Sequence, residues 1–166
     1  SNSIEVDSRR IRVGLTTNLS DANVNIGNTI LQNGTNARGN LVGKTGSASG
    51  SLTIVNPGIG YTPSDGSSLT YLSIPLISVT GNGLDATADI TIGRGSSGDG
   101  VAIAATIFEG GSGYEVGEVV RVDQVGGPFG RNLLLSIAGI SSVNQLIIDN
   151  VQGEFEVGVG KTLSYL

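Results

Sequence analysis

The 166-residue chain contains no cysteine, histidine, methionine or tryptophan. Without cysteine, disulfide bonds and thiolate chemistry are excluded. The lack of both histidine and cysteine also removes the commonest zinc ligands and the Ser-His and Cys-His catalytic pairs. We therefore expect no enzyme, no metal centre and no cofactor.

Positive charge is scarce as well. Nine Lys and Arg oppose 14 Asp and Glu, which gives a net charge of −5. Binding to a phosphate backbone depends on clustered basic side chains. The only such cluster, Arg9, Arg10 and Arg12, is more typical of a solvated strand or arm than of a phosphate site. Nucleic acid is therefore not an expected partner.

Long hydrophobic runs are missing too. The longest are Leu133–Leu135 and Leu146–Ile148. They are far shorter than the roughly 20 residues that a membrane-spanning helix needs. We expect no membrane insertion.

Aromatic residues are few, with four Tyr and three Phe, whereas 27 residues are Gly. Most other apolar residues are Val, Ile, Leu and Ala, and β-branched side chains favour strands. No window of a dozen residues has apolar residues at helical spacing without Gly or Pro, whereas residues 86–92 alternate apolar and polar at period two. The sequence predicts an all-β protein with essentially no helix.

A glycine-rich motif occurs twice and begins a third time. Residues 52–61 end in Gly-Ile-Gly-Tyr, and residues 105–114, shifted by 53 positions, end in Gly-Ser-Gly-Tyr. A third copy, shifted by 94 positions, starts at Leu146, ends with Tyr165 and Leu166, and has Phe155 where the first copy has Tyr61. Repetition of a turn-and-strand unit is typical of arrays that form extended scaffolds.

The repeats suggest a division of the chain into small antiparallel β modules, sandwich-like or solenoid-like. The expected parts are an N-terminal β segment at 1–50, β repeat one at 51–92, β repeat two at 101–140 and a partial third repeat at 143–166. The N-terminal segment has strand candidates at Ile11–Leu15 and Val24–Leu31, and we expect a loop from Gly39 to Gly50. The third copy must pair back onto earlier strands, pair with another chain, or stay unpaired.

The second repeat contains three further strand candidates, of two kinds. Residues 103–108 and 133–137 are apolar enough to be buried on both faces. Around Val119 and Val120 we expect a half-buried strand whose polar residues, Glu118, Arg121 and Asp123, face water.

Glycine and tyrosine are the candidate turn residues. Glycine adopts backbone dihedrals that are closed to other residues, so the chain can reverse within a few positions. A tyrosine ring can then cover the turn while its hydroxyl reaches water or a carbonyl. Exposed rings could instead stack on a sugar, and Tyr71 and Tyr165 have the same two interpretations. The predicted turn residues are Gly58, Gly60, Tyr61, Gly81, Gly83, Gly111, Gly113, Tyr114 and Gly117.

Three other chemistries stay open. A Ser-Lys pair would use one of two lysines in loop-like stretches, and a glycosidase would use two carboxylates. Calcium could bind acids beside glycine loops, although turn formation explains the same residues. The residues concerned are Lys44 and Lys161 for the first, Asp85 with Asp89 or Glu115 with Glu118 for the second, and Asp85, Asp89 and Asp99 for the third.

The repeat also resembles a known family. The run at 54–62, the Gly-Asn-Gly at 81–83, the alternating strand at 86–90 and the second copy at 110–118 carry the resemblance. They are similar to repeats in virion structural proteins of tailed phages, especially the tail, baseplate and fibre proteins of marine myoviruses that infect cyanobacteria. The resemblance covers residues 51–166 and implies a non-catalytic scaffold and assembly element in the virion.

The same resemblance implies partners and an alternative role. Phage fibres suggest a homo-oligomer, with a trimer favoured, in contact with other virion proteins. Similar repeats occur in large secreted bacterial surface proteins. The alternative is thus a receptor- or glycan-binding module of a phage fibre or of a bacterial adhesin, which would bind a host surface glycan.

Overall fold

The computed structural model describes residues 10–165 except 124, 126–129 and 158–161. The chain forms two compact units: unit 1 comprises Ser1–Thr45 and Ser142–Leu166, and unit 2 comprises Gly46–Ser141. All sheets are antiparallel, and strands account for 60% of the described residues. Among the described residues, the one helical element is the 3-10 turn η1 (Asp21–Asn23). The all-β prediction is confirmed.

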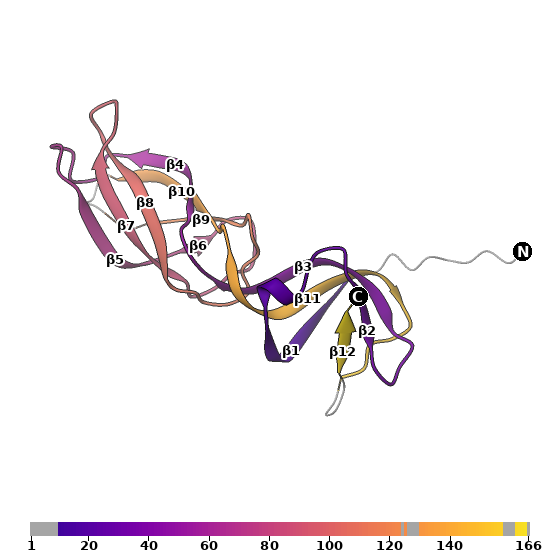
Figure 1. Cartoon of the computed structure of the whole chain (residues 1–166). Helices are drawn as coiled ribbons and strands as arrows, with labels where there is room; N and C mark the ends of the chain where they lie inside the picture. The colour runs from indigo at the N-terminus through magenta and orange to yellow at the C-terminus, as the bar shows by residue number, and fades with distance from the viewer. Residues whose placement is uncertain (1–9, 124, 126–129, 158–161, 166) are drawn as a thin grey trace, which may run out of the picture. The chain divides into compact units, whose positions relative to one another are not determined.

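Unit 2 contains repeats one and two in two sheets. One sheet has the order β5-β7-β8, and the other has the order β4-β10-β9-β6 (Figure 1). The strands are β4 (Thr53–Ile59), β5 (Leu69–Pro75), β6 (Ile77–Ser78), β7 (Thr87–Arg94), β8 (Gly100–Glu109), β9 (Val119–Arg121) and β10 (Arg131–Ser136).

The alternating pattern at 86–92 gives β7, whose apolar residues Ala88, Ile90 and Ile92 are fully buried. The apolar runs at 103–108 and 133–137 were expected to be buried on both faces, and the structure differs. β8 exposes half or more of Ile103 and Phe108, and β10 alternates buried and half-buried residues. Both strands therefore have one inner and one outer face, as expected where a sheet has a core on one side only.

The two repeats of unit 2 exchange strands. In the first sheet Ala88 of β7 pairs with Ile107 of β8, and in the second Leu135 of β10 pairs with Ile54 of β4. β4 opens repeat one and β8 opens repeat two, and their equivalent residues Ile54 and Ile107 are 53 positions apart. The residues that pair with them, Leu135 and Ala88, are 47 positions apart. Both pairings also carry a bulge at the same point. Each repeat thus pairs its last strand with the first strand of the other repeat.

The two sheets of unit 2 meet on both sides. The amide of Leu52, just before β4, donates to the carbonyl of Ala105 in β8, and Ser51 bridges Thr106. On the other side β5 continues into β6 after Leu76 alone, and β6 pairs with β9. If β5 and β6 count as one position, the strands form a ring of six positions in the order β4, β8, β7, β5/β6, β9, β10.

Unit 1 contains the N-terminal segment and the third copy in one five-stranded sheet. Its order is β1-β11-β3-β2-β12 (Figure 1). The strands are β1 (Ile11–Ser20), β2 (Thr29–Gln32), β3 (Arg38–Ala48), β11 (Ile140–Gln152) and β12 (Leu163–Tyr165). Of the three possibilities for the third copy, the structure therefore has it pairing back onto earlier strands of the chain.

The expected loop from Gly39 to Gly50 is wrong, because most of it forms β3. Gly39 lies against β11, where an added Cβ would collide with the Ile148 side chain and lie 2.9 Å from the Asp149 carbonyl oxygen. Glycine is needed here for close strand approach and not for a turn. The expected strand from Val24 also begins later, at Thr29, because η1 and a turn precede it.

Unit 1 repeats the strand order of unit 2 with one position missing. β11 corresponds to β4 by the shift of 94, which matches Gln145 to Ser51. Gln145 pairs with Gly14 of β1, and Ser51 bridges Thr106 of β8, so β1 corresponds to β8. β3 and β2 follow β11 as β10 and β9 follow β4, and β12 pairs with β2 as β6 pairs with β9. Five of the six ring positions are therefore filled, and no described strand lies between β1 and β12.

Candidate functional site

The two Gly-x-Gly-Tyr motifs have the same backbone. Gly58 and Gly60 have φ of +70° and +78°, and Gly111 and Gly113 have φ of +59° and +77°. Only glycine adopts such values without strain. Gly117 also has a positive φ of +89°. The repeated glycines therefore set the same turn after β4 and after β8.

The tyrosine that ends each motif is buried against a glycine of the other repeat. Tyr61 and Tyr114 expose only 3% and 0% of their surface. A Cβ at Gly130 would collide with the Tyr61 ring, and a Cβ at Gly83 would collide with the Tyr114 ring. We call the glycine that each ring contacts its glycine seat. Ring and glycine seat come from different repeats in both cases, so the tyrosines interlock the two repeats.

The two buried hydroxyls differ. The Tyr114 hydroxyl accepts a hydrogen bond from the Ala86 amide at 3.2 Å, whereas the Tyr61 hydroxyl is buried and forms none. Burial raises the pKa of both phenols, and the Ala86 amide that donates to Tyr114 offsets part of the rise in the Tyr114 pKa. Neither ring is available to stack on a ligand.

Glu118 was expected to face water but is buried, with 5% of its surface exposed. Its carboxylate accepts hydrogen bonds from the Ser78 hydroxyl at 2.6 Å, the Gly83 amide at 3.0 Å and the Glu115 amide at 3.1 Å. A Cβ at Gly81 would collide with the same carboxylate. Glu118 therefore ties the loop 81–83 of repeat one to repeat two. Sequence alternation missed it because its burial comes from this long-range loop.

Two of the acids that were considered for calcium accept hydrogen bonds from separate serines. Asp89 accepts a hydrogen bond from the Ser73 amide at 2.9 Å, and Asp99 accepts one from the Ser97 hydroxyl at 3.2 Å. Asp85 lies in a turn with a φ of +66°. Within the described part of the chain, no three Asp or Glu side chains come together in a way that could hold a metal ion.

Lys44 lies on β3 and stabilises the η1 turn. Its ammonium is 2.6 Å from the Asp21 carboxylate and donates to the carbonyls of Asp21 and Val24 at 3.1 and 2.6 Å. These bonds occupy the group that a Ser-Lys mechanism would use as its base. The other candidate, Lys161, lies outside the described residues.

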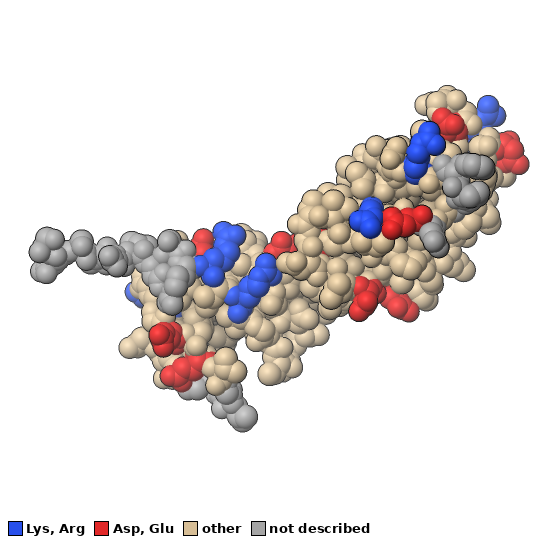
Figure 2. Space-filling view, turned by 180° about the vertical axis from the view of Figure 1, so that it is seen from behind, with Lys and Arg blue, Asp and Glu red and all other residues tan. Residues whose placement is uncertain are grey.

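The described arginines of the N-terminal cluster contact β11. Arg12 donates to the Gln145 side chain at 3.0 Å, and Arg10 lies 3.9 Å from the Asp149 carboxylate. Arg9 lies outside the described residues. Figure 2 shows charged side chains scattered singly or in small groups between uncharged areas. No described helix is long and apolar enough to cross a membrane.

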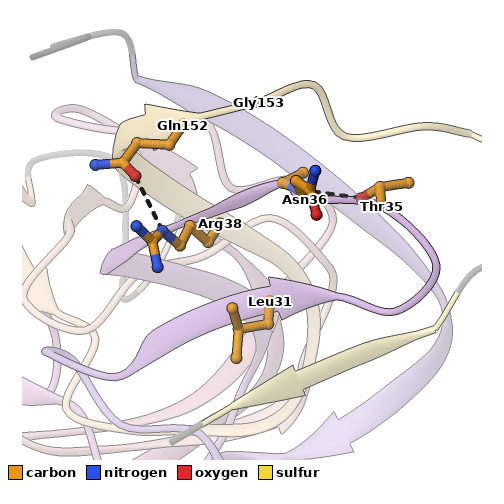
Figure 3. A pocket seen from close by; sticks show the side chains of 7 residues that line it. Leu31, Thr35, Asn36, Arg38, Gln152 and Gly153 are labelled. Carbon is orange, nitrogen blue, oxygen red and sulfur yellow. Dashed lines mark hydrogen bonds between the residues drawn. The ribbon is translucent and has the colours of Figure 1, made fainter.

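A cavity of about 510 Å³ lies beside the β2–β3 connection and the end of β11 (Figure 3). Arg38 donates to the Gln152 side chain at 2.9 Å, and the Thr35 hydroxyl accepts from the Ala37 amide at 3.1 Å. These polar groups already bind one another.

A second cavity of about 520 Å³ lies in unit 1 between β1 and β12, and the sequence did not predict it. Its apolar lining includes Ile11, Val13, Leu15, Leu146, Phe155 and Leu163. At its edge the Gln32 amide exchanges two hydrogen bonds, of 2.7 and 2.8 Å, with the backbone of Glu156, as a neighbouring strand would. The available signal was the alternation of Ile11, Val13 and Leu15, which marks one face of a strand.

Comparison of the chain with protein-family models, with curated proteins and with solved structures gives no match.

Proposed function

We propose that the chain is a non-catalytic β-repeat scaffold and assembly element of a phage virion, in the tail, the baseplate or a fibre. The observation that supports this role best is the interlocking of the repeats in unit 2. Each buried tyrosine and its glycine seat come from different repeats, and so do the paired strands. Such an arrangement resists separation of the repeats, which suits a load-bearing element.

The distribution of polar groups supports the same role. Glu118 and Lys44 bind backbone groups of turns, and two of the three acids considered for calcium, Asp89 and Asp99, accept hydrogen bonds from Ser73 and Ser97. The virion location and the partners, a homotrimer and other virion proteins, rest on the resemblance of the repeats.

The alternative, a receptor- or glycan-binding module, predicted solvent-facing aromatic rings. Tyr61 and Tyr114 are buried, and Phe155 is half-buried. Burial of both tyrosines removes the rings on which that alternative depended most.

Labelling of particles tests the proposal. Antibodies raised against the purified chain are applied to phage particles and to host cells from the source of the sequence, and examined by electron microscopy. The proposal predicts label at a defined position on the particle and a trimer by light scattering. Label on the cell surface alone would favour the bacterial adhesin, and label on neither would contradict both.

A further inference from the structure

The open position in unit 1 lies between two strands that lack a neighbour. Among the described residues, β1 pairs with β11 only and β12 pairs with β2 only. Both strands are therefore ends of the described sheet, and each has one row of backbone N–H and C=O groups that pairs with no described strand. Unpaired edges of this kind are templates for another strand.

In unit 2 the corresponding position is filled by β7. This strand pairs antiparallel with β8 on one side and with β5 on the other. Its inward side chains Ala88, Ile90 and Ile92 are all fully buried, and the residues between them, such as Thr91, are half-buried. β7 thus defines what fits the position: small or β-branched apolar residues at every second place.

The lining of the unit 1 cavity is what such a strand would cover. Ile11, Val13 and Leu15 of β1 line the cavity and are only half-buried. The pairing of β1 with β11 places Val13 where Ala105 lies in β8, and Ala105 is 3% exposed beneath its sheet. The same strand position is therefore covered in unit 2 and left partly uncovered in unit 1.

We infer that the cavity between β1 and β12 accepts one further extended β-strand of the same kind as β7, antiparallel to both edges, with small or β-branched apolar residues at alternate positions. The inference rests on the proposed assembly role and names its mode. Main-chain hydrogen bonds supply affinity in such strand addition, and alternate side chains supply specificity. The described strands of this chain are all engaged in their own sheets, and β7 is paired on both sides. The strand that fills the cavity is therefore none of the described strands of this molecule.

A peptide with the sequence of residues 85–94 is the direct probe, because it contains β7. We expect saturable 1:1 binding to the full chain by calorimetry, with a Kd of about 10 μM. Hydrogen exchange of the β1 and β12 amides should slow on binding. A control peptide with Ile90→Asp and Ile92→Asp should bind at least about 100-fold more weakly, because it would bury unpaired charges.

Two variants of the chain locate the site. Val13→Glu places a charge in the cavity and should abolish binding, whereas Val55→Glu, at a residue that is 53% exposed in unit 2, should leave it unchanged. Circular dichroism checks folding. If Val13→Glu does not fold, the milder Leu15→Thr replaces it and should weaken binding about tenfold.

Three results would overturn the inference. They are no binding at millimolar peptide, equal binding of both peptides, and undiminished binding to the folded cavity variant. A concentration-dependent dimer that the peptide dissociates would show that a second copy of the chain fills the cavity, and this would also overturn the inference. Particles labelled by antibody without peptide binding would leave the proposed function standing and reject this mode alone.

Discussion

Unit 2 and unit 1 share a strand order but differ in completeness. Unit 2 fills all six positions of its ring, and its two sheets meet on both sides. Unit 1 has counterparts of five of these strands, and a cavity of about 520 Å³ lies where the sixth, β7, would lie. The module is therefore a ring of six strand positions. In unit 2 the strands of two repeats together fill it, and in unit 1 one position is open.

The units also differ in how they fix the turn after the strands β8 and β1. Unit 2 uses two glycines with positive φ and the buried Tyr114. Unit 1 uses the η1 turn, which Lys44 holds through the Asp21 carboxylate and two carbonyls. One strand position is thus followed by two chemically unrelated turns.

The largest expected effect comes from breaking the turn of unit 2. Gly111→Ala forces a residue with Cβ to a φ of +59°, where that Cβ would collide with the Leu84 carbonyl and lie 2.6 Å from the Ala86 amide. We expect a loss of about 3 kcal/mol or more in the free energy of unfolding, measured with urea. Gly14→Ala on β1 is the matched control, since no atom lies within 4 Å of its added Cβ. Equal losses would contradict the account.

Removal of the buried charge should have the next largest effect. Glu118→Gln keeps the shape of the side chain but turns an amide toward groups that donate hydrogen bonds. We expect a loss of about 2 kcal/mol by urea unfolding. The exposed Glu109→Gln should cost less than about 0.5 kcal/mol. A Glu118→Gln protein as stable as the parent would contradict the role of this carboxylate in joining the repeats.

The two tyrosine hydroxyls sharpen the comparison between the repeats. Tyr114→Phe leaves the Ala86 amide without its acceptor and should cost about 1 kcal/mol. Tyr61→Phe removes a buried hydroxyl that has no hydrogen bond and should be neutral or stabilising. Thermal unfolding of the two single variants measures the difference. The reverse order of stability would show that the two rings are not placed as described.

The smallest effect concerns pH. Burial raises the pKa of Tyr61 and Tyr114 above the ordinary value of about 10. The folded state therefore favours the neutral phenol. The stability from this source is complete below about pH 10 and is lost as the pH rises through the raised pKa values. Urea unfolding between pH 8 and pH 11 should show this loss, and the double variant Tyr61→Phe, Tyr114→Phe should show less of it.

The sequence predicted those parts of the fold that depend on local pattern. Period-two alternation located β7, and the all-β class followed from composition. β3 was missed because Gly39 satisfies a close approach to Ile148, a residue more than one hundred positions away. The burial of Glu118 was missed for the same reason, since its partner Ser78 lies 40 positions earlier.

The open position in unit 1 could not be predicted from the motif. β1 carries no Gly-x-Gly-Tyr turn after it, so its equivalence to β8 is visible only in the pairing with β11. The exchange of strands between repeats is likewise a long-range arrangement. Local propensity does not encode which of several similar strands become neighbours.

Completion of the third copy tests the central claim most directly. Leu166 matches Leu72 by the shift of 94, so residues 73–94 are appended after Leu166 to supply a second β7 sequence. Residue-resolved hydrogen exchange is then compared between the parent and the extended chain. The account predicts that the outward amides of β1 exchange rapidly in the parent and at least about tenfold more slowly in the extended chain, with β8 unchanged. Equal exchange of β1 in both proteins would contradict the claim that unit 1 has an open place for this strand.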